Sequence, residues 1–140
     1  MPTRLREYQK IVETTGFHAP IGEDLNLHFT HIQKGKARFE LEVEKRHLNS
    51  IDVVQGGILT AMADAAMGLA FGSLVDKNRK FATMELKMSF MKPVMKGRLI
   101  AEGWVVKKGK RAGFAESAIY LNEISEKNLV SKSSSSLIVL

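Results

Sequence analysis

A run of about twenty mainly apolar residues in the middle of the chain constrains the fold more than any other feature. It extends from Gln55 to Leu74 and is rich in Ala, Met and Leu, which favour a helix. Its length also meets the requirement for a transmembrane span. Asp64 lies near its middle, where a charge costs roughly 2.5 to 3.5 kcal/mol on membrane-insertion scales. We therefore expect a helix that is buried on all sides by a curved sheet, with a membrane span as the weaker alternative.

Alternating apolar and polar residues on both sides of this run predict strands. Two strands are expected before it, at about 25–33 and 37–44, and four after it, at about 82–91, 98–107, 112–122 and 129–139. The last four are joined by short loops without a crossover helix, so neighbouring strands are expected to be antiparallel. A short amphipathic helix is expected within residues 1–20. The sequence thus predicts one α+β domain over residues 1–140, with an antiparallel sheet around one long central helix.

Two details of the expected strands can be tested. In the strand at 82–91, the alternation places Met84 and Leu86 on one face and Thr83 on the other. Ser133–Ser136 forms a low-complexity run, which can indicate a flexible tail. Apolar residues follow it at once, so we expect it to lie in the final strand, where small side chains let the helix approach the sheet.

Composition limits the chemistry. The chain has no cysteine, which excludes disulfides, thiolate metal sites and a cysteine nucleophile, and fits a reducing compartment. The first ten residues, MPTRLREYQK, lack the apolar segment of a signal peptide, so we expect a cytoplasmic protein. The four histidines show no metal-ligand spacing with carboxylates, so no metal is expected, and His47 is expected to be structural.

The net charge of +6, from 21 Lys plus Arg against 15 Asp plus Glu, suggests a polyanionic partner. Aromatic residues make up only 7% of the chain, and no glycine-aromatic RNA-binding motif occurs. Nucleic acid is therefore the weaker interpretation, and a phosphorylated small molecule suits the short basic clusters better. A merely solvated surface remains the alternative for each cluster.

Asp64 and the start of its helix are the candidate functional groups. A carboxylate inside an apolar helix needs partners, and such carboxylates often act as general bases or nucleophiles. The alternative is a structural Asp that bonds neighbouring backbone or faces a subunit interface. Gly56 and Gly57 leave the first backbone N–H groups of the helix accessible at the positive end of its dipole, where an oxyanion would be stabilised. Asn49 could add an amide contact, although a Gly-Gly pair can also simply permit a turn.

Residues 47–68, HLNSIDVVQGGILTAMADAAMG, resemble the signature of hotdog-fold acyl-CoA thioesterases of the PaaI-like, or 4-hydroxybenzoyl-CoA thioesterase-like, family. That signature has an Asn, a short loop, His-Gly-Gly, an acid on the helix and then a small residue. The positions that match are Asn49, Gly56, Gly57, Asp64 and Gly68. The strand that starts at Thr83 is similar too, since it ends on Phe90, two residues and Pro93.

Two positions depart from the pattern of this family. Gln55 replaces the histidine, which argues for hydrolysis over dehydration because glutamine cannot transfer a proton at neutral pH. Asp52 replaces a glycine that is common in the preceding loop, and this bears on the loop geometry alone.

The resemblance implies a thioesterase that hydrolyses an acyl- or aryl-acyl-CoA to the free acid and coenzyme A. It implies a homodimer, or a tetramer as a dimer of dimers, with Asn49, Gln55 and Gly56 from one subunit facing Asp64 and Thr83 from the other. The Gly56 N–H would polarise the thioester carbonyl, with Gly57 also binding substrate. Asp64 would attack the carbonyl or deprotonate a water that Thr83 places.

Coenzyme A would be part of the substrate, with no separate cofactor, and its phosphates would meet Lys107, Lys108 and Arg111. On this model neither nucleic acid nor a membrane is a partner. The alternative function is a non-catalytic hotdog protein that binds acyl-CoA as a sensor or a scaffold.

Overall fold

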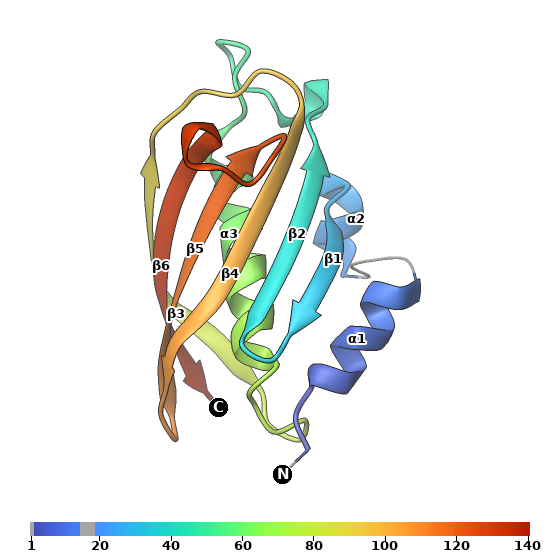
Figure 1. The fold of residues 1–140 in the computed structure, drawn as a ribbon, viewed down its shortest axis with the longest axis vertical. Helices are drawn as coiled ribbons and strands as arrows, with labels where there is room; N and C mark the ends of the chain where they lie inside the picture. The colour runs from blue at the N-terminus through green and yellow to red at the C-terminus, as the bar shows by residue number, and fades with distance from the viewer. Residues whose placement is uncertain (1, 15–18) are drawn as a thin grey trace.

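The sheet is antiparallel throughout, and its strands lie in the order β1-β2-β4-β5-β6-β3. The computed structural model describes residues 2–14 and 19–140. Within them the strands are β1 (His28–Gln33), β2 (Lys36–Glu42), β3 (Phe81–Phe90), β4 (Arg98–Lys108), β5 (Ala112–Leu121) and β6 (Leu129–Val139). Figure 1 shows the strands curving in front of the long helix α3 (Gly56–Gly72), with β3 at one edge of the sheet. The strand order follows from the chain path, because α3 connects β2 to the far edge and β4 then returns to pair with β2.

Two shorter helices precede the sheet, α1 (Leu5–Thr14) and α2 (Pro20–Leu25). The predicted amphipathic helix is confirmed by α1, which lies beside β1, while residues 15–18 of the expected N-terminal segment lie outside the described residues (Figure 1). The sequence did not predict α2. Proline is well suited to its first turn, and Asn26 ends it in the left-handed region at φ 55°. Single 3₁₀ turns at Lys45–His47 and Glu126–Asn128 complete the helical elements of the described chain.

Small residues of the sheet allow α3 to lie very close to it. A Cβ added to Gly103 on β4 would come within 2.4 Å of the Ala66 carbonyl carbon, and one added to Gly113 on β5 within 2.4 Å of the Phe71 ring. The buried Ser133 and Ser135 of β6 serve the same purpose. The serine run therefore lies in the final strand, as predicted, and is not a tail.

One face of α3 is left open, which corrects the expectation of a helix buried all round. Leu59, Met62 and Ala66 are buried toward the sheet, whereas Gly57 and Asp64 are exposed on the opposite side. A single curved sheet reaches around only part of a helix, so a second layer would be needed to cover the rest. Among the described residues, no helix combines the length and apolar character needed to cross a membrane.

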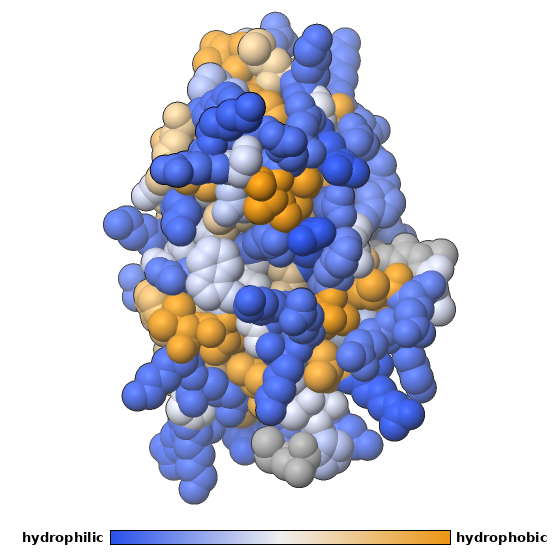
Figure 2. All heavy atoms as spheres, viewed as in Figure 1, coloured by the Kyte–Doolittle hydropathy of each residue, from blue (hydrophilic) through white to orange (hydrophobic). Residues whose placement is uncertain are grey.

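The other face of the sheet is mainly polar, with a few apolar patches, as Figure 2 shows from the same side as Figure 1. Arg38 and Glu102 form an ion pair across it at 3.1 Å, and the Lys132 ammonium lies 5.4 Å from the centre of the Trp104 ring. The sheet thus has one wet face and one face on α3. This arrangement confirms the predicted α+β class and is the hotdog fold.

Candidate active site

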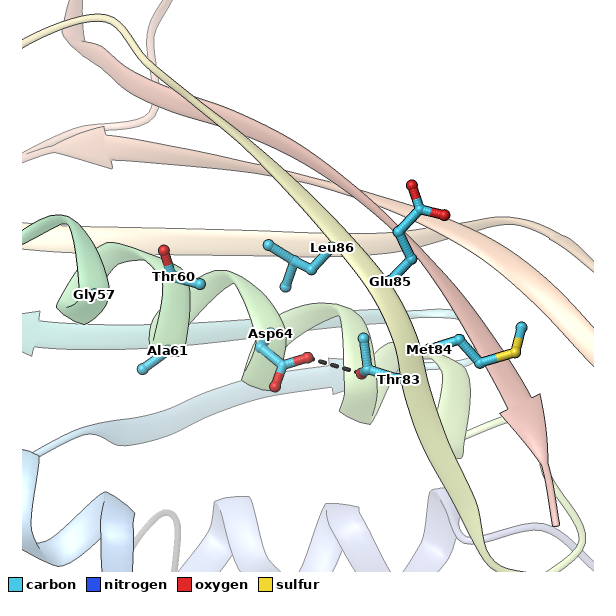
Figure 3. A pocket seen from close by; sticks show the side chains of 8 residues that line it. All are labelled: Gly57, Thr60, Ala61, Asp64, Thr83, Met84, Glu85 and Leu86. Atoms are coloured by element: carbon cyan, nitrogen blue, oxygen red, sulfur yellow. Dashed lines mark hydrogen bonds between the residues drawn. The ribbon is translucent and has the colours of Figure 1, made fainter.

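Asp64 and Thr83 meet on the open face of α3. The Thr83 hydroxyl donates a 2.8 Å hydrogen bond to Oδ1 of Asp64 (Figure 3). Asp64 is exposed in the single chain, so the expectation of a buried carboxylate is wrong. The second oxygen, Oδ2, has no partner within the described part of the chain. The carboxylate is therefore held at one oxygen and accessible at the other.

A β-bulge in β3 turns Thr83 toward Asp64. Thr83 pairs with Leu137 of β6 and Glu85 pairs with Ser136, so Met84 has no partner in the ladder. Thr83 and Leu86 consequently both face α3, although strict alternation would place them on opposite faces. The predicted alternation of this strand is thus wrong at its start. Bulges commonly re-aim a side chain beside an active site.

An open cavity of about 500 Å³ surrounds this carboxylate. Its lining residues are Gly57, Thr60, Ala61, Asp64, Thr83, Met84, Glu85 and Leu86. Figure 3 shows the Glu85 side chain pointing away from Asp64. The place of Glu85 beside this cavity depends on the bulge, so the sequence pattern gives no signal for it.

The start of α3 presents backbone donors, as predicted. Gln55 precedes the helix, its own backbone N–H donates to the His47 carbonyl at 2.9 Å, and its side chain is exposed and makes no capping bond. The first N–H groups of a helix have no partner within the helix. Those of Gly56 and Gly57 find none elsewhere among residues 2–14 and 19–140. Both amides are available to a ligand.

Asn49 organises the loop before α3. Its Oδ1 accepts hydrogen bonds from the backbone N–H of Ile51 at 3.0 Å and of Val53 at 3.3 Å. Asp52 has φ 61°, in the left-handed region. This explains why glycine is common at that position in the resembling family, since glycine adopts such a φ without strain. Asn49 thus fixes the path into Gln55.

His47 is structural, as expected. It is 1% exposed, and its Nε2 lies 2.8 Å from the Leu25 carbonyl while its Nδ1 accepts the Glu44 N–H at 2.9 Å. The pKa of Glu44 lies below its usual value, chiefly because the Arg46 guanidinium donates a hydrogen bond to its carboxylate. Both ring nitrogens of His47 are therefore used to hold the segment that leads to α3.

A second, apolar cavity lies beside the start of α3, and sequence reasoning missed it. It measures about 410 Å³ and is lined by Val53, Val54, Gly56, Leu59, Phe90, Met91, Lys92, Pro93 and Val94. Phe90 lies against Gly56, because a Cβ on this glycine would be 3.2 Å from the Phe90 Cζ. The Phe-x-x-Pro motif was the one sequence signal for the segment from Phe90 to Pro93. The motif does not indicate that Phe90 contacts Gly56.

The predicted basic residues lie around the hairpin between β4 and β5. Lys107 and Arg111 are exposed, and the Lys108 Nζ donates to the Gly109 carbonyl at 3.2 Å. A hollow of about 360 Å³ lies beside them, lined by Met84, Lys107, Gly109, Ala112, Gly113, Phe114 and Ser136. Met84 also lines the Asp64 cavity, so the bulge adjoins both spaces.

The predicted site residues thus form separate groups in one chain. Gly56 and Asp64 are eight residues apart on the same helix, which is about 12 Å along its axis. Thr83 belongs to the Asp64 group, and Asn49, Gln55 and Phe90 belong to the Gly56 group. The described residues include no cluster of three His, Cys, Asp or Glu side chains that could hold a metal ion.

The sequence matches the model of the thioesterase superfamily over residues 52–126. A protein of Archaeoglobus fulgidus named "Putative esterase" is 32% identical over 103 residues, which are 73% of this chain and 62% of that protein. The chain spans about three fifths of the length of the curated relatives it matches.

Solved structures share the fold. A thioesterase family protein from Silicibacter pomeroyi superposes with a TM-score of 0.83 at 20% identity and covers 96% of both chains. A variant of the phenylacetic acid degradation protein PaaI from Thermus thermophilus has a TM-score of 0.77 at 25% identity, over 87% of this chain and 100% of its own. At 20% identity, the first likeness concerns the fold alone.

Proposed function

Because the chain belongs to the thioesterase superfamily, we propose that it is an acyl-CoA thioesterase that hydrolyses an acyl- or aryl-acyl-CoA to the free acid and coenzyme A. One observation carries the proposal. Asp64, the one carboxylate on an otherwise apolar helix, is held at Oδ1 by Thr83 and opens at Oδ2 into a cavity. This is the geometry of a group that takes a proton or attacks a carbonyl.

In the hydrolytic step, Oδ2 of Asp64 takes a proton from a water molecule while the water oxygen bonds to the thioester carbonyl carbon. The Thr83 hydroxyl fixes the carboxylate and helps to place that water. The oxyanion that forms accepts a hydrogen bond from the Gly56 N–H. The C–S bond then breaks, and the leaving coenzyme A thiolate takes up the proton that Asp64 received, which restores the carboxylate. Alternatively, Oδ2 of Asp64 attacks the carbonyl carbon itself and displaces the coenzyme A thiolate. The mixed anhydride that results is then hydrolysed by water.

Two copies of the chain are needed for this reaction. A carbonyl must lie within about 3 Å of its oxyanion donor and close to the base. Gly56 and Asp64 of one chain are about 12 Å apart along α3, so no single carbonyl can contact both. Antiparallel packing of two α3 helices would bring Gly56 of one copy against Asp64 of the other. We therefore place each active site across the interface of a homodimer.

Two surfaces support this interface. The open face of α3 carries the exposed Gly57 and the half-buried Ala61, whose small size allows two helices to approach closely. Strand β3 has ten residues and pairs only with β6 in the described chain, so its outer edge is available to a second β3. Pairing two such dimers into a tetramer is an extension of the same proposal.

Coenzyme A needs cations for its phosphates, and Lys107, Lys108 and Arg111 supply them at the hairpin beside the Asp64 cavity. Gly57 lines the Asp64 cavity, and the exposed side chain of Gln55 lies next to it at the start of α3, so both can contribute donors near the carbonyl. Asn49 acts indirectly, by fixing the loop that positions Gln55 and Gly56.

The first test is thiol release from short, medium, long and aromatic acyl-CoAs by the wild type, Asp64→Asn and Glu85→Gln. We expect Asp64→Asn to lose roughly 10²- to 10⁴-fold in kcat, the usual share of a general base. Glu85 is the matched control, because it lines the same cavity but points away, and its variant should remain within a few-fold of the wild type. A folded Asp64→Asn variant with full turnover would remove Asp64 from the mechanism. Saturable acyl-CoA binding without turnover in any protein would instead support the non-catalytic alternative.

Subunit mixing tests the shared site. Gly56→Pro removes the proposed oxyanion donor, while proline suits the first helical position and Gln55 already has the extended backbone that precedes proline, at φ −59° and ψ 133°. Alone, Gly56→Pro and Asp64→Asn should both be inactive. Mixed in equal amounts and allowed to exchange subunits, they should recover about a quarter of wild-type activity, because half of the dimers would hold one intact site. No recovery after verified subunit exchange would mean that Gly56 and Asp64 act within one chain.

A further inference from the structure

The cavity beside the start of α3 differs in chemistry from the one that holds Asp64. Its floor consists of Val54, Leu59 and Val94, all at most 6% exposed, and its rim includes Phe90, which is 55% exposed. Lys92 is the only charged residue in the lining. By contrast, the Asp64 cavity holds the Asp64 carboxylate beside the Thr83 hydroxyl. Of the two, only the apolar cavity suits an uncharged hydrocarbon group.

Gly56 connects this cavity to the reaction. It lines the cavity, and its N–H is the donor that the proposed function places on the thioester oxygen. A carbonyl bound there has two substituents, the acyl group and the pantetheine arm. The pantetheine arm carries two amides that need hydrogen-bond partners, and the side chains of this lining offer only Lys92. The acyl group needs none.

Phe90 stands at the rim of this cavity, beside Gly56. Its ring lies so close to Gly56 that a Cβ there would be 3.2, 3.6 and 3.7 Å from three ring carbons. A carbonyl bound at the Gly56 N–H would therefore have this ring beside it, and an acyl chain that enters the cavity from there would run along the ring. Because the Phe90 side chain is exposed, truncating it should cost the protein little stability.

We propose that this cavity binds the acyl group and that Phe90 limits its size, so that the substrates are CoA thioesters of uncharged medium-chain or arylacyl groups. This inference rests on the proposed function. Protein pockets for small molecules measure roughly 300 to 1,000 Å³, and this one lies near the lower end. A long fatty acyl chain would therefore not fit, and its excess length would extend past the rim into solvent. Up to the floor, each added methylene should improve kcat/KM by roughly fourfold.

The test uses two series of graded chain length, acyl-CoAs for thiol release and non-hydrolysable S-alkyl-CoA thioethers for binding by calorimetry. Phe90→Ala should move the optimum of both series to longer chains and raise the preference for them at least tenfold. Val53→Phe, which fills the half-buried side of the same cavity, should move both optima to shorter chains. Met95→Ala is the matched control, because Met95 is 64% exposed at the same end of the molecule but is not part of the lining.

The two readouts separate this inference from the proposed function. Optima that move in opposite directions for Phe90→Ala and Val53→Phe, with Met95→Ala unchanged, support it. If the thioether binding optima shift in these opposite directions but no variant hydrolyses acyl-CoA, the acyl cavity is supported and the proposed thioesterase activity is overturned. Hydrolysis whose chain-length profile is the same in all variants would overturn the acyl cavity and leave the thioesterase standing. The absence of both binding and hydrolysis would overturn both.

Discussion

Replacing Gly103 by alanine should strongly destabilise the protein, because this glycine is where α3 and the sheet touch backbone to backbone. The added Cβ would lie 2.4 Å from the Ala66 carbonyl carbon, 2.5 Å from the Ala66 oxygen and 2.7 Å from the Met67 nitrogen. Carbon atoms in contact are normally about 3.5 Å or more apart, so the helix must move away by about 1 Å. A gap of that size forfeits about a quarter to a half of the contact energy of the atoms that line it.

The expected loss of unfolding free energy is about 3 kcal/mol. Overpacking a core typically costs about 1 to 3 kcal/mol when side chains can rearrange, and here the obstructing atoms are backbone, so the upper end applies. For 140 residues this corresponds to a fall in Tm of roughly 10 °C. Urea denaturation followed by far-UV circular dichroism measures it without relying on Trp104, which adjoins the mutation.

A double variant distinguishes backbone contact from side-chain crowding. Ala66→Gly removes the nearby side chain but leaves the carbonyl in place, so it should not rescue Gly103→Ala, and the double variant should be no more stable than Gly103→Ala alone. Rescue by Ala66→Gly, or a loss below about 1 kcal/mol for Gly103→Ala, would refute the argument that close backbone approach sets the helix position.

Two further predictions concern the open face of α3 and the N-terminal helix. Gly68 is buried, but a Cβ there would meet no neighbouring atom within 4 Å, so Gly68→Ala should leave the fold intact. The extra methyl group should weaken dimerisation by about tenfold in analytical ultracentrifugation if α3 packs closely on its copy, and an unchanged dissociation constant would place the interface elsewhere. Burial raises the pKa of Tyr8 from 10.0 to about 12, so the folded state holds the phenolic proton more tightly than the unfolded chain, and this share of stability is full below about pH 10 and lost as the pH rises toward 12. Urea denaturation of Tyr8→Phe over this pH range should show a shallower loss of stability than the wild type, and parallel curves would contradict the assignment.

The sequence predicted the bounds of helices and strands better than it predicted which of their residues are buried. The apolar run at 55–74 indicated α3 to within two residues at each end, because helix formers and flanking turn residues act locally. The exposure of Asp64 could not be predicted. Small residues such as Gly57 and Ala61 carry no charged or polar side chain, so in the sequence pattern an open face made of them is indistinguishable from a buried one.

The candidate site was recognisable from motifs, but its geometry was not. The spacing of Gly56 and Asp64 identified both groups, and helix geometry then separates them by two turns. The contact between Phe90 and Gly56 joins segments more than thirty residues apart, and no periodicity encodes it. The left-handed backbone of Asp52 was equally hidden, because an aspartate gives a weaker signal for such a φ than a glycine.

The bulge in β3 has a consequence for how this strand can evolve. Met84 occupies a place in the backbone with no cross-strand partner, and its side chain is 55% exposed. Many side chains could therefore stand at position 84 without disturbing the core. Removing the residue altogether would rotate Thr83 away from α3 and leave Asp64 without its hydroxyl. Selection should accordingly preserve the length of the strand at this point while tolerating changes of residue type.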